Sequence, residues 1–133
     1  MARELEIIEN YLAIQQIRFA DRLTVEMRVD PTALNGLVPC FLLPPIVENA
    51  IRHGIAHREE DGVIRTAIQR SGNRLHLQVR DNGPGADGRS KPGHGIGLKN
   101  TIDRLAHFYQ ESYEFTVIQP AAGGFEVNIT IPY

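Results

Sequence analysis

Apolar residues near the start of the chain recur every three or four positions, which is the spacing of one face of an α-helix. Over residues 4–19 this face comprises Leu5, Ile7, Ile8, Tyr11, Leu12, Ile14 and Phe19. Over residues 22–29 the pattern changes to strict alternation. Its apolar positions are Leu23, Val25, Met27 and Val29. We therefore predict a helix followed by a strand with one buried face.

Proline and glycine divide the middle of the chain. We expect a second helix that begins at Pro44, runs to about His53 and stops at Gly54. Two alternating segments near 63–70 and 74–80 follow, separated by a short polar turn. They predict a β-hairpin.

Residues 81–97 are rich in glycine and nearly free of apolar side chains, so we expect a loop of more than about 15 residues, a length typical of segments that are either functional or disordered. A third helix begins near Gly97. The residues that it is expected to bury are Leu98, Ile102, Leu105 and either Phe108 or Tyr109. A final hairpin pairs the segment near 113–117 with that near 125–131.

This order of elements predicts an α+β fold, an α/β sandwich. Strands with one apolar face need cover on one side only. We expect a mixed, mostly antiparallel sheet with three helices packed on one face.

Composition limits the classes of function. With 133 residues, 42% of them hydrophobic, and a net charge of −2, the chain suits one soluble domain and shows no basic excess for nucleic-acid binding. The apolar stretch at 37–47 is too short for a membrane span and is interrupted by prolines. Cys40 lies among apolar residues, which predicts a buried thiol in a reducing compartment such as the cytosol.

The segment PPIVENAIRHG carries a cluster of functional groups. Wound as a helix, it gathers four polar side chains within about 140° of the circumference. They are Glu48, Asn49, Arg52 and His53. An amide oxygen suits Mg²⁺, and cationic side chains suit phosphate. The solvated face of an ordinary amphipathic helix has the same pattern.

The segment RDNGPG places Asp81 at a strand end, just before Gly83 and Gly85. Backbone without side chains lets a flat ring approach a fixed acceptor, which can bind an exocyclic amine such as that of adenine. Guanine offers a carbonyl there and would be rejected. A plain Asp-Asn-Gly turn is the alternative.

The segment GHGIGLKN opens the third helix. A glycine-rich backbone that leads into a helix N-terminus presents free amides to phosphate oxygens. The spacing of Gly93, Gly95 and Gly97 matches neither a dinucleotide-binding fingerprint nor a P-loop. A flexible loop before a helix remains the alternative.

In this order, ENAIRHG, DNGPG and GHGIGLKN resemble the N, G1 and G2 boxes of the Bergerat or GHKL fold, the ATP-binding fold of histidine kinases, type II topoisomerases, mismatch-repair ATPases and a heat-shock chaperone family. The flanking segments extend the resemblance over nearly the whole chain. They are ENYLAIQQIRFADRL, VPCFLLPPIVENAIRHGI, LKNTIDRLAHFY and GGFEVNITIP, and they are similar to the LytS-like class of bacterial sensor histidine kinases. LLPP departs from the class, which usually has a Gln and a single Pro there.

The resemblance implies that ATP binds between the helices under a short lid, roughly Gly85 to Gly95. It implies that Asn49 ligates Mg²⁺ and that Asp81 binds the adenine amine, and it matches Glu48 to the general base of the hydrolysing relatives. The other residues that it implies for ATP binding are Arg52, His53, Gly83, Gly85, Gly93, Gly95, Ile96, Gly97 and Leu98.

The implied reaction is transfer of the γ-phosphoryl group of ATP to a histidine upstream of this fragment. Residues 1–20 would continue from the upstream dimerisation and phosphoacceptor region, and residues 21–133 would form the catalytic domain. The implied partners are the histidine-bearing helix, of the same or a partner protomer, and a response regulator. The full-length protein would be a homodimer attached to the inner membrane, with this domain in the cytoplasm. The fragment itself would contact neither nucleic acid nor membrane.

Two other functions fit parts of the pattern. One is a stand-alone ATPase of the same fold or an anti-sigma-factor-like protein-serine kinase, against which the LytS-like flanks argue. The other is a degenerate nucleotide-binding module used only for interaction, against which the intact Glu48, Asn49, Asp81 and glycine set argue.

Overall fold

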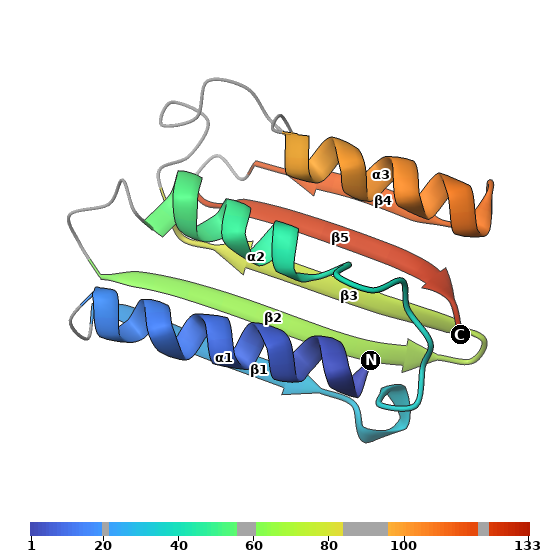
Figure 1. Cartoon of the computed structure of the whole chain (residues 1–133), viewed down its shortest axis with the longest axis horizontal. Coiled ribbons are helices and arrows are strands. Elements are labelled where there is room, and N and C mark those ends of the chain that lie inside the picture. Colours follow the sequence, from blue (N-terminus) through green and yellow to red (C-terminus); the bar gives the residue numbers. More distant parts are fainter. Residues whose placement is uncertain (20–21, 56–60, 84–95, 120–122) are drawn as a thin grey trace.

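The computed structural model describes residues 1–19, 22–55, 61–83, 96–119 and 123–133, which form one sheet covered by helices (Figure 1). The helical elements are α1 (Ala2–Arg18), the 3-10 turn η1 (Pro31–Ala33), α2 (Pro44–Ala50), the π-helical turn η2 (Ile51–Ile55) and α3 (Ile96–Tyr109). The strands are β1 (Leu23–Val29), β2 (Gly62–Ser71), β3 (Arg74–Asp81), β4 (Glu114–Ile118) and β5 (Phe125–Pro132). The predicted order of helices and strands is confirmed.

The five strands lie in the order β1-β2-β3-β5-β4. β1 and β2 are parallel, and every other neighbouring pair is antiparallel. Parallel neighbours need a crossover connection, which the segment containing α2 supplies. The prediction of a mixed, mostly antiparallel sheet is confirmed.

All three helices lie on the same face of the sheet (Figure 1). The strands alternate accordingly. The buried positions of β5 are Phe125, Val127, Ile129 and Ile131. β3 alternates in the same way and ends at the buried Asp81. The core therefore fills the space between helices and sheet, and the other face of the sheet is polar.

α1 buries a narrower stripe of apolar side chains than the hydrophobic pattern predicts, and of the two alternatives at the end of α3 it is Tyr109 that faces the core. Ile14 of α1 is 63% exposed, and Phe108 of α3 is 59% exposed. Tyr109 is partly buried instead, and burial raises the pKa of its phenol. A helix packs on a sheet along one side only, so a residue at the margin of its apolar face, such as Ile14, stays in solvent. No helix in the described residues is long and apolar enough to span a membrane.

The second helix does not stop at Gly54 as predicted. η2 carries the helical run through Gly54 to Ile55. Ile55 is buried, and a Cβ atom built on Gly62 would lie 2.6 Å from its Cδ1 atom, so Ile55 packs on the start of β2. The burial of Ile55 stabilises the continued helix more than the glycine at position 54 favours its end. Such wide π turns are rare and occur frequently at functional sites.

The segment before α2 also differs from expectation, because Cys40 is exposed and the prediction of a buried thiol was wrong. Phe41 has a φ of 60°, in the left-handed region, and it is exposed as well. Leu42 and Leu43 are fully buried. The chain thus turns at Phe41, and Arg104 of α3 donates hydrogen bonds to the carbonyl oxygens of Cys40 and Phe41.

A buried carboxylate joins α1 to the start of α2. Glu4 is 4% exposed; its Oε2 accepts a hydrogen bond from the Phe41 N–H (2.9 Å) and its Oε1 from the Leu43 N–H (3.0 Å). Leu43 is the N-cap residue of α2, which has no side-chain cap of its own. Glu4 therefore satisfies backbone donors there and places negative charge at the positive end of the helix dipole.

We expect Glu4→Gln to lower the free energy of unfolding by about 1–3 kcal/mol, because an amide NH₂ then faces a buried backbone N–H. Urea unfolding measures the change. Glu6→Gln, at an exposed position of α1, is the matched control and should alter stability by less than about 0.5 kcal/mol. Equal unfolding midpoints for the two variants would contradict the role assigned to Glu4.

Candidate functional site

Asp81 is the last residue of β3 and lies on the helix-covered face of the sheet. Its Cα is paired with Ile64 of β2 on one side and with Phe125 of β5 on the other. The side chain is only 2% exposed, and its Oδ1 accepts a hydrogen bond from the Gly83 N–H at 2.9 Å. A carboxylate has two oxygens and about four lone-pair directions, so it can accept further hydrogen bonds from a ligand.

Gly83 is the point where three segments meet. A Cβ atom built on Gly83 would lie 2.5 Å from the Cα of Gly54, so η2 and the turn after β3 touch backbone to backbone. The Gly83 carbonyl accepts a hydrogen bond from the Gly124 N–H at 3.0 Å. Gly124 has a φ of 96°, and a Cβ there would lie 2.6 Å from the carbonyl oxygen of Asp81. Only glycine fits at these contacts.

Asn82 holds the same turn to the beginning of β2. Its Oδ1 accepts a hydrogen bond from the Val63 N–H at 2.7 Å, and its Nδ2 lies 3.5 Å from the carbonyl oxygen of Asp61. We expected no role for Asn82 from the sequence. The Asx-type bonding that Asn favours in turns was the available signal, but the partner strand could not be identified from the sequence.

The four polar side chains that we predicted to form one cluster on the second helix do not share one environment in the structure. Glu48 and Arg52 are exposed and line a pocket of about 280 Å³ between α1 and α2. Asn49 is half-buried. The backbone of His53 belongs to η2, and its side chain lies outside the description.

The wall of this pocket that α1 contributes was missed by the sequence analysis. Tyr11 and Arg18 line it together with Ile51 and the two charged residues of the second helix. Burial raises the pKa of the Tyr11 phenol, and the Glu48 carboxylate raises it further. The Tyr11 phenol therefore lies close enough to these charged side chains to be affected by them.

α3 begins at Ile96, one residue before the predicted start, and Leu98 in its first turn is 1% exposed. Leu98 anchors the start of the helix in the core. The backbones of Ile96 and Gly97 form the first turn. Gly85, Gly93 and Gly95, together with the predicted lid, lie outside the described residues.

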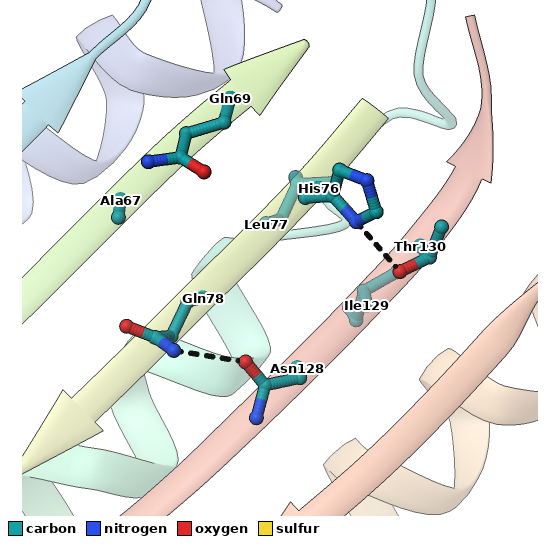
Figure 2. Close-up of a pocket in the computed structure, with 8 residues that line it drawn as sticks. All are labelled: Ala67, Gln69, His76, Leu77, Gln78, Asn128, Ile129 and Thr130. Atoms are coloured by element: carbon teal, nitrogen blue, oxygen red, sulfur yellow. Dashed lines mark hydrogen bonds between the residues drawn. The ribbon is translucent and has the colours of Figure 1, made fainter. Parts of the chain in front are cut away.

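A larger pocket, of about 370 Å³, lies on the open face of the sheet, away from these residues (Figure 2). Its polar side chains bond mainly to one another. His76 Nδ1 lies 3.0 Å from Thr130 Oγ1, and Gln78 Nε2 donates to Asn128 Oδ1 at 3.0 Å. This is the self-satisfied polar surface of a one-sided sheet, so the candidate site remains at the end of β3.

Comparison with known proteins adds independent findings. Residues 41–133 match the family described as histidine kinase-, DNA gyrase B-, and HSP90-like ATPase. The chain is 37% identical to the sensor histidine kinase YpdA of Escherichia coli strain K12, covering 98% of this chain and 24% of that protein. It is 36% identical to the sensor protein LytS of Staphylococcus haemolyticus, covering 82% of this chain and 20% of LytS. The chain thus spans about a quarter of the length of these relatives.

Solved structures show the same fold at low sequence identity. The catalytic domain of the histidine kinase ThkA superposes with a TM-score of 0.68 at 14% identity, covering 95% of this chain and 90% of that one. The mycobacterial sensor histidine kinase MprB superposes with a TM-score of 0.62 at 20% identity, covering 96% of this chain and 93% of that one. The predicted fold class is confirmed.

We expect Gly83→Ala to destabilise the protein by about 1–3 kcal/mol, because the new methyl group meets backbone that cannot rotate away. Denaturant unfolding measures the cost, and the Gly54 amide resonance should shift. Gly72→Ala is the control. No atom lies within 4 Å of a Cβ built on Gly72. This variant should therefore lose only the stability that a left-handed backbone costs an alanine, and the Gly54 amide resonance should stay where it is. An unmoved Gly54 resonance in Gly83→Ala would contradict the contact.

Proposed function

Because this chain belongs to the histidine kinase-, DNA gyrase B-, and HSP90-like ATPase family, we propose that it is the ATP-binding catalytic domain of a two-component sensor histidine kinase. The observation that carries the proposal is the buried Asp81 carboxylate beside the glycine contact of η2 with the turn after β3. A fixed acceptor next to backbone without side chains suits a flat base with an exocyclic amine.

The adenine amine donates a hydrogen bond to Asp81. The carboxylate is held by the Gly83 N–H, so it is oriented before the base arrives. A buried acceptor also selects the base, because a guanine carbonyl at this position would leave two acceptors opposed without a proton between them. Gly83 and Gly85 border the base.

The phosphates lie toward the start of α3, where Gly93, Gly95, Ile96, Gly97 and Leu98 supply backbone amides. The buried Leu98 supports this assignment, since it fixes the first turn of the helix. Asn49 ligates Mg²⁺ through its amide oxygen, which is a hard donor of the kind that this ion prefers. Mg²⁺ neutralises charge on the transferring phosphoryl group. Arg52 and His53 lie near phosphate or ribose.

The γ-phosphoryl group passes to a histidine outside this chain. The chain spans about a quarter of the sensor kinases that it resembles, which leaves room for an upstream acceptor helix. That helix, of the same or a partner protomer, and a response regulator are the proposed protein partners. The full-length protein is a homodimer attached to the inner membrane, and this domain lies in the cytoplasm.

We expect Asp81→Asn to weaken ATP binding by about a hundredfold or more, because the amide NH₂ opposes the adenine amine. The fold should persist, since the remaining Asn oxygen can still accept the Gly83 N–H. Calorimetric titration with Mg·ATP and a thermal melt measure the two effects. Asp103→Asn, at an exposed position of α3, is the isosteric control and should bind as wild type does. Equal affinity of both variants would refute the adenine assignment.

We expect acid-labile, base-stable phosphate on the upstream segment when ATP is added to the longer protein that carries it. Autoradiography after acid and base treatment identifies phosphohistidine. ATP consumption without phosphohistidine, or acid-stable phosphate on serine, would instead support the stand-alone ATPase or the serine kinase.

A further inference from the structure

The backbone of Phe41 is bonded by charged side chains from two different helices. Its N–H donates to Glu4 Oε2 of α1 at 2.9 Å, and its carbonyl oxygen accepts from Arg104 Nη1 of α3 at 3.2 Å. Neighbouring groups extend both contacts. Glu4 Oε1 accepts from the Leu43 N–H at 3.0 Å, and Arg104 Nη2 donates to the Cys40 carbonyl. This short segment is thus held by α1 through its N–H groups and by α3 through its carbonyl oxygens.

The conformation of Phe41 is one that a phenylalanine rarely adopts. Its φ of 60° lies in the left-handed region, and the residue is 58% exposed, so burial of the ring does not hold it there. A residue keeps such a backbone where the surrounding contacts impose it, and residues of this kind gather at functional sites. The hydrogen bonds from Glu4 and Arg104 are contacts that can impose it.

The Arg104 guanidinium closes one end of the space between α2 and α3. The two helices run side by side in opposite directions and contact each other (Figure 1). Cys40 and Phe41 come shortly before α2, whereas Arg104 lies in the second half of α3. The two arms of the guanidinium fork reach neighbouring carbonyl oxygens, so they tie the start of α2 to the later part of α3.

The other end of this helical run is held separately. Gly54 of η2 touches Gly83, in the turn after β3, backbone to backbone. Asn49, the proposed Mg²⁺ ligand, lies between the two fastened ends. The proposed phosphate amides begin at Ile96, about 12 Å along α3 from Arg104. The groups proposed for Mg²⁺ and phosphate therefore lie on the two helices that Arg104 ties together.

We infer that Arg104 is a positioning residue for the triphosphate half of the site. By tying the start of α2 to α3, it sets the gap across which the Mg²⁺ ligand of one helix and the phosphate amides of the other face each other. The inference rests on the proposed function. Groups on separate helices bind one Mg·ATP well only when their spacing is fixed. The adenine half depends instead on Asp81 and Gly83, which the contact with Gly54 holds.

Amide NMR titrations of this chain with Mg·ATP and with adenosine, which has the base and ribose but no phosphate, test this role. We expect Arg104→Ala to weaken Mg·ATP binding by about tenfold or more and to leave the affinity for adenosine within about twofold, because only the phosphate-binding groups lose their spacing. Arg104→Lys should fall between the wild type and Arg104→Ala, since lysine keeps the charge but lacks the fork that reaches two carbonyl oxygens.

Arg74→Ala is the matched control. Arg74 Nη1 also donates to a backbone carbonyl of another segment, that of Ser112, at 3.2 Å. Arg74 lies at the start of β3, however, at the opposite end of the strand from Asp81. This variant loses the same kind of hydrogen bond away from the site, so it should bind Mg·ATP and adenosine as the wild type does.

Wild-type affinity for Mg·ATP in Arg104→Ala would overturn the inference. So would equal losses of Mg·ATP and adenosine binding in either Arg104 variant, which indicate a general loss of structure, or the same selective loss in Arg74→Ala. If a thermal melt shows that Arg104→Ala does not fold, Arg104→Lys decides: a loss confined to Mg·ATP supports the inference, and wild-type affinity overturns it. A wild type that binds neither ligand would instead contradict the proposed function, so the two failures are distinguishable.

Discussion

The contact between the backbones of Gly54 and Gly83 is the constraint on which the candidate site depends. It brings the end of the second helix against the turn after β3, with 2.5 Å between the Gly54 Cα and any Cβ at Gly83. Two further hydrogen bonds hold the same turn. The Asp81 side chain accepts one from the Gly83 N–H, and the Gly83 carbonyl accepts the other from the Gly124 N–H. A buried carboxylate is therefore held beside a bare backbone surface, as a base-binding site requires.

The rest of the fold keeps this contact in place. The helix that carries Gly54 is anchored at its start by Glu4 of α1 and at its end by Ile55 on β2. Because the helices cover only one face of the sheet, the buried Asp81 comes to lie beneath them and not on the open polar face. The position of α1 then has a second effect: it forms one wall of the pocket that contains Glu48 and places Arg18 next to it.

Local patterns predicted the elements well but not the contacts between them. Alternation in β3 and β5 predicted a one-sided sheet because each buried position contacts the same core. The glycine stop signal at 54 failed because burial of Ile55 outweighs it. The prediction that the Cys40 thiol is buried was wrong because the left-handed turn at Phe41 changes which side chains of this segment face the core. Glu4 carries no local signal, since its hydrogen-bond partners Phe41 and Leu43 lie on another element far along the sequence.

We propose above all that the site at the end of β3 binds ATP and selects it by its amine. Amide NMR of the chain titrated with Mg·ATP and, separately, with Mg·GTP tests this most directly. We expect saturable shifts with ATP at Asn49, Gly54, Gly83 and Leu98, and a much smaller response to GTP at the same concentration. Equal responses to the two nucleotides, or ATP-induced shifts confined to the open sheet face around Gln78 and Asn128, would contradict it.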